Sequence, residues 1–262
     1  FPAPEAASAI DVLGREGFAR VDSVLSASKA NKLLEHIGDE LERKRELAVA
    51  DAGDLAAAAS FGDVLMREQR YDLLLDLDPP VRDALEEALA PLKPVVAGTL
   101  GEDAELFELA ALISDPRAPR QPAHPDTPFR EGDGAAVLTT FVALQDVSED
   151  MGPTDVIPGT HTADAHRKFN TADDGGRERI ALLRETPNHR GVLPTGSANL
   201  IDSRLIHCGG SNQSSKRRVL FYFSFRRRGK VTPSGSMLYK FRRSGYALDN
   251  ADEWLSEAAP VA

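Results

Sequence analysis

The chain has 262 residues, of which 42% are hydrophobic and 27% are charged, and this composition suits one large globular domain. The net charge of -10 argues against general affinity for nucleic acid, and a single cysteine excludes an internal disulfide framework and a Cys-rich zinc site. No apolar run approaches the roughly 18 residues that a membrane span needs, so we expect a soluble, intracellular protein. Its compartment stays open, because the sequence begins at Phe1 and a preceding segment is expected to be missing.

The first hundred residues favour helices, with one short strand before them. Residues 17–25 alternate apolar and polar side chains, which predicts the strand, and Leu and Ile then recur at helical spacing over residues 33–41. A second helix is expected to begin after the prolines at 79–80 and to be disrupted at Pro91 and Pro94. We therefore predict a helical N-terminal layer over about residues 1–105.

Short runs with β character follow from about residue 106. They cover residues 106–114, 135–147, 155–157, 191–193, 197–203 and 219–226, and one helix is expected near residues 163–183. Several short strands separated by turn residues are typical of an all-β sandwich or barrel. This core is expected to extend to about residue 246 and to form, with the helical layer, a single domain over residues 1–262.

Two histidines and one aspartate are the candidate metal ligands. His124 and Asp126 are separated by one residue, so on an extended segment both side chains point to the same side. Such a pair alone is weak evidence, but His207 follows 81 residues later at the end of a predicted strand. Two histidines and one carboxylate leave three positions open on iron, as non-haem Fe(II) oxygenases require, whereas zinc usually prefers a closed shell or one open water position.

An arginine follows the last of these candidates. Arg218 lies eleven residues after His207 and begins the run RVLFYFSF, whose β-branched and aromatic residues predict a buried strand. A guanidinium facing the interior could bind a carboxylate through two parallel hydrogen bonds. A surface charge at a strand edge is the alternative for Arg218 taken alone.

The last quarter of the chain is basic although the whole protein is acidic. Residues 203–248 contain eleven Lys and Arg and no Asp or Glu. Solvated strand ends that balance acidic helices elsewhere would explain this distribution. A binding patch for an anionic substrate, centred on residues 226–230, is the other interpretation.

Three motifs together resemble the phytanoyl-CoA dioxygenase family. That family has a His-x-Asp motif, later a segment close to NGPLxxxPGSH, and then a histidine followed eleven residues later by arginine. This sequence has HPD at residues 124–126, MGPTDVIPGTH at residues 151–161, and HCGGSNQSSKRR ending at Arg218. The segment from residue 17 to residue 37 also resembles the family's N-terminal strand and helix, so the likeness covers residues 17–226.

The resemblance implies a double-stranded β-helix (jelly roll, cupin-like) core and assigns site residues. It implies that His124, Asp126 and His207 hold the catalytic metal and that Arg218 binds the distal carboxylate of 2-oxoglutarate. The family also implies co-substrate or pocket contacts for three further residues, Gln121, Gly209 and Phe141, although Phe141 could equally be ordinary core. Gly209 stands where the family often has serine, and Met151 stands where it has asparagine. These two departures put the neighbouring co-substrate contacts in question.

The activity that the resemblance implies is hydroxylation of a small organic substrate. Fe(II), 2-oxoglutarate and O2 are the expected cofactors and co-substrates, with ascorbate helpful, and succinate and CO2 are the expected co-products. The aspartate at position 126 leaves no vacant ligand position for a halide, which favours hydroxylation over halogenation. The substrate itself cannot be named from the fold. No nucleic-acid or membrane partner is expected, and the oligomeric state stays open.

Two other functions remain open at this point. One is a metal-binding module that has lost turnover and serves as a sensor, which the departures at Gly209 and Met151 would suit. The other is a cupin-like metalloenzyme that uses no 2-oxo acid, in which Arg218 would have no role in binding.

The remaining histidines and the cysteine are expected to be structural. His161 is expected to hydrogen-bond its turn, while His36, His166 and His189 have polar neighbours and are expected to be exposed. Cys208 is expected to be a partly buried thiol without a catalytic role.

Overall fold

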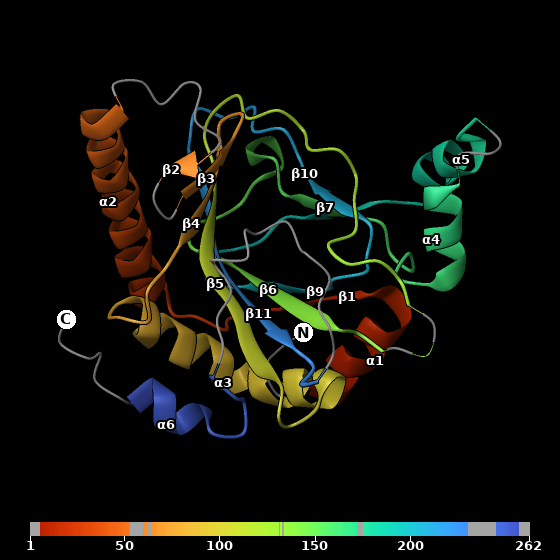
Figure 1. Ribbon diagram of the computed structural model, residues 1–262, viewed down its shortest axis with the longest axis horizontal. Helices are drawn as coiled ribbons and strands as arrows, with labels where there is room; N and C mark the ends of the chain where they lie inside the picture. Colours follow the sequence, from red (N-terminus) through yellow and green to blue (C-terminus); the bar gives the residue numbers. More distant parts are fainter. Residues whose placement is uncertain are drawn as a thin grey trace.

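The computed structural model describes residues 6–52, 60–61, 64–130, 132, 134–171, 175–229 and 245–256. These residues form two antiparallel sheets with helices mainly on one side (Figure 1). The helices are α1 (Ala6–Glu16), α2 (Ala27–Ala52), α3 (Val81–Leu100), α4 (Ala163–Asn170), α5 (Arg177–Glu185) and α6 (Ala251–Ser256), with a 3-10 turn, η1, at Glu149–Met151.

The larger sheet contains eight strands in the order β1-β9-β6-β11-β5-β4-β3-β2. They are β1 (Phe18–Val21), β2 (Ser60–Phe61), β3 (Val64–Arg67), β4 (Arg70–Leu74), β5 (Glu105–Ser114), β6 (Val137–Ala143), β9 (Ala198–Asp202) and β11 (Arg218–Arg226). The smaller sheet has the order β10-β7-β8, with β7 (Thr154–Val156), β8 (His189–Gly191) and β10 (His207–Gly209). This architecture agrees with the mainly β core expected from the sequence.

Strand β11 shows how the larger sheet divides its two faces. Because successive side chains of a strand point to opposite sides, the odd-numbered residues from 219 to 225 face the helices and the even-numbered residues face the smaller sheet. The aromatic rings of Phe221, Phe223 and Phe225 lie in the core cluster that includes α2 and α3. Leu220 and Tyr222 lie in a second cluster with residues of β6 and β7.

The helical layer packs on the first of these faces. Leu33, Ile37 and Leu41 of α2 are fully buried, as their spacing predicts. The expected disruption of α3 at Pro91 and Pro94 is wrong, because α3 continues through both prolines to Leu100. Each proline removes one backbone hydrogen bond, but the buried side chains of the last helical turns, Leu92, Val95, Val96 and Leu100, pack into the core and keep the segment helical.

The sequence analysis expected helices and one short strand in the N-terminal part of the chain, but this part contains more strands than that. Strands β1 to β4 also lie in this part and extend the larger sheet, with β4 paired to β5. The connection between β3 and β4 is a two-residue turn in which Glu68 and Gln69 both have positive φ, 37° and 64°. Asn-Gly or Asp-Gly is the usual signal for such a turn. A Glu-Gln turn lacks that signal, which explains why the sequence did not predict this hairpin.

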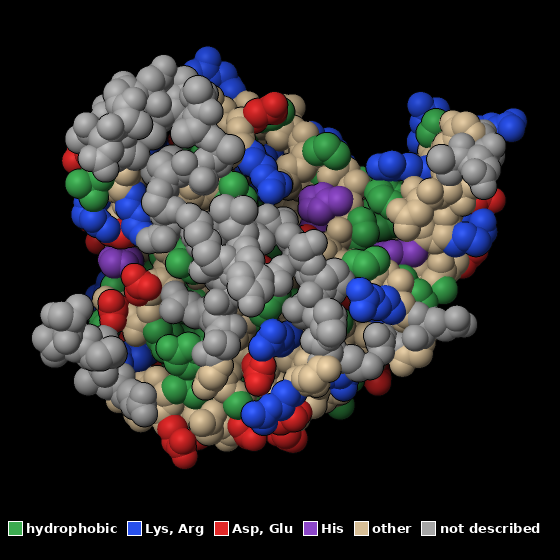
Figure 2. Space-filling view, in the orientation of Figure 1, with side chains coloured by type: hydrophobic (Ala, Val, Ile, Leu, Met, Phe, Trp, Pro, Cys, Tyr) green, Lys and Arg blue, Asp and Glu red, His purple; other side chains and the backbone are tan. Residues whose placement is uncertain are grey.

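A two-helix arm projects from the smaller sheet. The single helix expected over residues 163–183 is wrong, because α4 ends at Asn170 and α5 begins at Arg177. Figure 2 shows a hollow between this arm and the body of the molecule, and the arm carries many charged side chains. Among the described residues, no helix combines the length and apolar character that a membrane crossing requires.

Candidate active site

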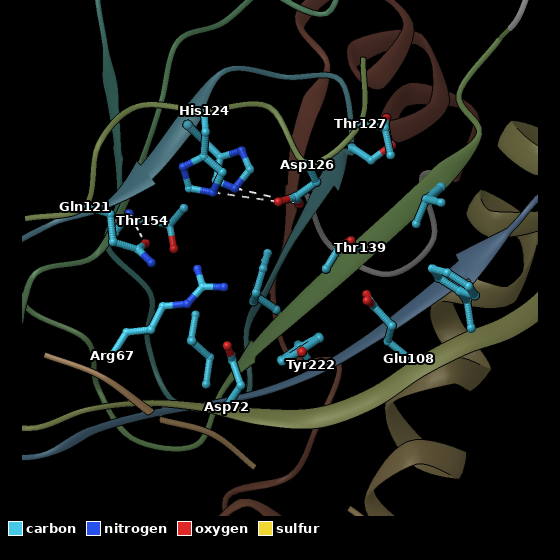
Figure 3. Close-up of a pocket in the computed structure, with 17 residues that line it drawn as sticks. Arg67, Asp72, Glu108, Gln121, His124, Asp126, Thr127, Thr139, Thr154 and Tyr222 are labelled. Atoms are coloured by element: carbon cyan, nitrogen blue, oxygen red, sulfur yellow. Dashed lines mark hydrogen bonds and ion pairs between the residues drawn. The ribbon is translucent and has the colours of Figure 1, made fainter. Parts of the chain in front are cut away.

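A cavity of ≈ 850 Å³, its mouth included, lies between the two sheets (Figure 3). Strands β3, β4, β5, β6 and β11 of the larger sheet line one side, while β7, β10 and the segment around residues 121–127 line the other. Both polar and apolar side chains border it. The alternation that builds the helix-facing core on one side of the larger sheet therefore leaves the opposite face available for a binding site.

The three candidate metal ligands converge on the wall of this cavity. The ligand atoms of His124, Asp126 and His207 all lie within 4.8 Å of one another. The two oxygens of Asp126 lie 3.8 Å from the Nε2 atoms of His124 and His207, respectively. Figure 3 shows the two imidazole rings side by side with the carboxylate directed toward them. Among the described residues this is the one group of three such side chains close enough to share a metal ion.

Backbone hydrogen bonds hold the two histidines in register. The amide of each residue donates to the carbonyl of the other, at 2.9 Å and 3.0 Å, which brings the loop containing His124 beside β10 and His207. Each ring uses Nδ1 to bond a carbonyl two residues earlier, Pro122 at 2.8 Å and Leu205 at 2.9 Å. These bonds orient Nε2 of both rings toward the shared site.

Electrostatics favour the neutral form of His124 that a metal ion needs. Burial lowers the pKa of the His124 imidazole, and His207 beside it lowers that pKa further, while the carbonyl of Pro122 and the carboxylate of Asp126 act in the opposite direction. A neutral imidazole has a lone pair on Nε2 for a metal ion. Two imidazole nitrogens and one carboxylate are a ligand set that suits non-haem iron with open positions for other ligands.

Arg218 is completely buried, so the alternative of a surface charge is excluded. Its guanidinium donates to the carbonyl of Gly152 and, at 3.1 Å, to the hydroxyl of Ser114, while its Nε atom has no hydrogen-bond partner. Burial lowers the pKa of Arg218 to about 9, and the positive charge of Arg70 contributes to this shift. A buried cation with no carboxylate partner in the described chain is costly, so it favours binding of an anion.

Arg70 is a second buried guanidinium at the same place, and the sequence analysis missed it. The registers of β4, β5 and β11 place Arg70 and Arg218 opposite Ser114 from its two sides. Arg70 is 5% exposed and donates to the Ser114 hydroxyl and to the carbonyls of Pro119, at 2.8 Å, and Gly210. Its Nε atom also has no partner. The sequence held no signal for Arg70, because the hairpin that carries it was not predicted.

The two departures from the family pattern have different structural explanations. A Cβ atom on Gly209 would lie 3.0 Å from Nη1 of Arg70 and 2.6 Å from Oε1 of Gln121, so these side chains fill the space that a serine would take. Gln121 accepts a hydrogen bond from the amide of Gly209 at 2.8 Å, so its oxygen is engaged by the backbone and its amide nitrogen remains for the cavity. Met151 is 3% exposed and lies in the second core cluster.

Phe141 borders the cavity and also belongs to the core, so both interpretations of this residue hold. Its ring contacts the ring of Tyr222, with 5.5 Å between the centroids. It is 8% exposed and lies in the second core cluster. The side chain thus forms an apolar wall between the metal-ligand cluster and the sheet.

Three polar residues on the larger sheet were also missed. Asp72, Glu108 and Tyr222 line the cavity from β4, β5 and β11 (Figure 3). Burial raises the pKa of Asp72 to about 6, and burial together with nearby carboxylates raises the pKa of Tyr222 well above its usual range. A shift in register between β5 and β11 forms a β-bulge, so that both Phe107 and Glu108 border the cavity.

The other histidines and the cysteine lie outside this cluster. His166 was expected to be exposed, which is wrong: it is 4% exposed, its Nδ1 accepts from the amide of Phe129 at 3.1 Å, and its Nε2 donates to the carbonyl of Arg204 at 2.6 Å. His189 is exposed, as expected, and His36 is partly exposed. His161 bonds the carbonyl of Gly14 at 3.1 Å. Cys208 is 2% exposed, and burial raises the pKa of its thiol, so the thiol is unreactive.

The solved structures similar to this chain share its fold at low sequence identity. A non-haem α-ketoglutarate-dependent carbocyclase, SnoK from nogalamycin biosynthesis, is 16% identical with a TM-score of 0.57, covering 88% of this chain and 87% of that chain. The epimerase SnoN in complex with Fe3+, α-ketoglutarate and nogalamycin RO is 17% identical with a TM-score of 0.55, covering 84% and 83%. AviO1 from Streptomyces viridochromogenes is 19% identical with a TM-score of 0.56, covering 88% and 98%. These neighbours confirm the expected fold class.

None of the curated protein sequences compared with this chain matches it. A sequence model of a whole family does match, over residues 13–220, which is most of the chain. That range includes all three candidate metal ligands and Arg218. The family's cofactors, iron and 2-oxoglutarate, fit the ligand set and the buried guanidinium pair described above. The chain therefore belongs to the phytanoyl-CoA dioxygenase (PhyH) family, as its motifs indicated.

Proposed function

We propose that this protein is an Fe(II)- and 2-oxoglutarate-dependent oxygenase that hydroxylates a small organic substrate and releases succinate and CO2. The observation that carries this proposal is the convergence of His124, Asp126 and His207 within 4.8 Å on the wall of an interior cavity. In this proposal these three side chains hold the iron. Bound iron and 2-oxoglutarate would supply the oxidising chemistry, in which decarboxylation of the 2-oxo acid activates O2.

The buried guanidinium pair supports the assignment of the co-substrate. Arg218 and Arg70 flank Ser114, and neither forms an ion pair with a carboxylate of the described chain. The distal carboxylate of 2-oxoglutarate would supply that missing anion, and the Nε atoms of both residues are buried without a hydrogen-bond partner. The anchoring of both guanidinium groups by carbonyls and by Ser114 orients them before the ligand arrives.

The remaining residues of the site exclude water and position the substrate. Phe141 and Leu112 border the cavity with apolar surface, and Thr139 and Thr154 add hydroxyl groups. Gln121 links the loop of His124 to β10 through the amide of Gly209, which holds the two ligand-bearing segments together. An apolar lining around a few fixed polar groups is typical of small-molecule sites.

Two measurements test the proposal. Anaerobic addition of 2-oxoglutarate to the Fe(II)-loaded protein should produce a visible charge-transfer band, and O2 with ascorbate should then yield succinate even without the true substrate. His124→Ala and Asp126→Ala should abolish both signals, because each removes one of three ligands. His36→Ala is the matched control, because His36 lies on α2, in the helical layer on the opposite side of the larger sheet, and is not part of the ligand cluster.

The outcome also separates the proposal from its alternatives. Band formation without succinate would favour a sensor module, and iron binding that 2-oxoglutarate does not perturb would favour a cupin-like metalloenzyme. Succinate formation that persists in both ligand variants would refute the proposal. Once a substrate is found, the mass of the product distinguishes hydroxylation from the ring-forming and epimerising reactions for which two structural neighbours are named.

A further inference from the structure

The larger sheet carries two chemically different groups along the same three strands. The buried guanidinium groups of Arg70 and Arg218 lie at the start of β4 and of β11, behind the cavity lining. Further along these strands and β5, the side chains of Asp72, Tyr222 and Glu108 border the cavity. Tyr222 lies four positions after Arg218 on β11, which corresponds to roughly 13 Å in an extended strand. We call the part bordered by Asp72, Glu108 and Tyr222 the acidic end.

Tyr222 carries a polar group without a protein partner. The residue is 5% exposed, it lines the cavity, and within the described chain its hydroxyl makes no hydrogen bond. The carboxylates of Asp72, Glu108 and Asp126 all act on this phenol electrostatically. A buried hydroxyl normally finds a partner. Its position beside Asp72, at the surface of the cavity, points to a ligand that supplies one (Figure 3).

The carboxylate of Asp72 also lacks a protein partner, and it carries a full charge when ionised. Its carboxylate lines the cavity, and within the described part of the chain it accepts no hydrogen bond and has no cationic atom within 4.0 Å. Arg67 also borders the cavity and acts on Asp72 from a greater distance. Asp72 is only partly exposed, and a carboxylate that faces a cavity without a cation in contact favours a cationic ligand group.

Glu108 adds the second carboxylate of the acidic end. Glu108 follows the same alternation as Leu112 and borders the cavity, and Ser224, opposite it on β11, donates to its Oε2 atom at 2.8 Å, which fixes the carboxylate in place. The ring of Phe107 lies next to it on the cavity wall. The acidic end therefore combines two carboxylates, one phenol and aromatic surface.

An alkylammonium group matches these acceptors better than other groups do. It has three N–H donors, whereas a hydroxyl offers one and leaves the charge of Asp72 without a cation in contact. The described part of the basic stretch gives no support for an anionic substrate, because Arg226 and Arg228 pair with Glu105 at the end of the sheet and Arg227 bonds the carbonyls of Ala135 and Thr99. Lys230, the last residue of that stretch, lies outside the described residues. In Figure 2, Lys and Arg side chains are interspersed with acidic ones on the visible face.

We infer that the acidic end binds a protonated amine of the substrate, with Asp72 and Glu108 as counter-charges and the oxygen of Tyr222 as a third acceptor. This inference rests on the proposed function, because the iron site and the co-substrate define which part of the cavity is left for the substrate. The substrate class is therefore a small organic amine whose oxidised carbon lies between the ammonium group and the metal ligands.

The experiment uses three probes of the same shape and different charge. Cyclohexylamine, cyclohexanol and cyclohexanecarboxylate are added separately to the protein loaded with Mn(II) and 2-oxoglutarate, and broadening of the ligand proton NMR signals by the bound Mn(II) reports binding near the metal. We expect the ammonium ion to bind about tenfold more tightly than either other probe. Asp72→Asn and Glu108→Gln should each weaken cyclohexylamine about tenfold and leave cyclohexanol unchanged.

Two further variants complete the design. Tyr222→Phe removes only the hydroxyl and should weaken cyclohexylamine by a smaller factor, about threefold. Asp39→Asn removes an exposed carboxylate of α2 and should change nothing, so it controls for net charge. Binding of 2-oxoglutarate should be unaltered in all four variants, which also shows that they are folded.

The contrary outcomes fall into two groups, which refute the inference and the proposed function, respectively. Equal or tighter binding of cyclohexanol or cyclohexanecarboxylate, absence of binding by all three probes, or unchanged amine affinity in Asp72→Asn and Glu108→Gln would refute the inference alone. Failure of Mn(II) to bind, seen in its EPR spectrum, or failure of 2-oxoglutarate to bind the Mn(II)-loaded protein would instead refute the proposed function.

Discussion

The guanidinium pair and the acidic end of the cavity hold charge in opposite ways. The guanidinium groups of Arg70 and Arg218 are held by backbone carbonyls and by the hydroxyl of Ser114. At the acidic end, the carboxylate of Asp72 and the hydroxyl of Tyr222 have no hydrogen-bond partner in the described chain. The protein thus orients its buried cations by its own backbone, whereas two polar groups of the acidic end face the cavity without a protein partner.

This comparison suggests how one sheet could separate two ligands. Strands β4, β5 and β11 carry both the guanidinium pair and the acidic end, a few residues apart along the strands. If the proposal and the inference hold, the dicarboxylic co-substrate would bind toward the guanidinium pair and the cationic substrate at the acidic end. The metal-ligand cluster lies on the facing wall.

The largest expected effect comes from removing the fully buried cation. Arg218→Ala should raise the concentration of 2-oxoglutarate needed for half-saturation by roughly 100-fold, because a buried ion pair would be left with one partner. Titration of the Fe(II) protein with 2-oxoglutarate, followed by its visible band, measures this change. Affinity for Mn(II) should be nearly unchanged, and an unaltered 2-oxoglutarate affinity would remove Arg218 from the site.

A second test examines the contact between Arg70 and Gly209. Arg70→Ala should weaken 2-oxoglutarate about tenfold, because one of two charge-assisted contacts is lost. Gly209→Ser should also weaken it, since the added Cβ would lie 2.6 Å from Oε1 of Gln121 and 3.0 Å from Nη1 of Arg70 and would displace both side chains. In the double variant, the serine has the space left by Arg70 and can donate to the same carboxylate. We therefore expect the double variant to lose less affinity for 2-oxoglutarate than the two single variants lose together. Losses that simply add would contradict the claim that Arg70 and a side chain at position 209 occupy the same space.

Asp72 at the acidic end should lower the free energy of unfolding by an amount that depends on pH. The pKa of Asp72 is raised from 3.8 to about 6 in the folded protein, so the ionised carboxylate is disfavoured by folding. The resulting loss of stability is absent below about pH 4, develops as the pH rises to 6, and is complete above it. Asp72→Asn should therefore increase the free energy of unfolding at pH 8 by about 1–3 kcal/mol and change it little at pH 4. Urea denaturation at both pH values measures the difference, and equal effects at the two values would contradict this account.

The smallest expected effect concerns the basic residues at the surface. Arg226 forms a partly exposed ion pair with Glu105 at 2.7 Å. Arg226→Ala should lower the free energy of unfolding by no more than about 1 kcal/mol. Affinity for 2-oxoglutarate and for cyclohexylamine should be unchanged. A loss of either affinity would indicate that the basic stretch does bind a ligand. It would also weaken the contrast between the guanidinium pair and the acidic end.

Sequence reasoning predicted the candidate metal ligands, which the structure brings together, more completely than the other residues of the cavity. His124, Asp126, His207 and Arg218 form patterns with fixed spacing, so they can be read along the chain. Asp72, Glu108 and Tyr222 belong to no motif, and each lies on a strand whose neighbours in the sheet are distant in sequence. The hairpin of β3 and β4 had no recognisable turn signal, which concealed Arg67, Arg70 and Asp72 together.

The sequence by itself determined the class of fold, the family and the candidate metal ligands, because hydrophobic periodicity and short motifs depend on residues that are close along the chain. The tertiary structure decided which charges face one another. Arg70 reaches Ser114 and Gly210 across 44 and 140 residues of sequence, and the Glu108 carboxylate meets the Ser224 hydroxyl across 116. Such contacts depend on strand register, which is set by the packing of the whole sheet against its helices.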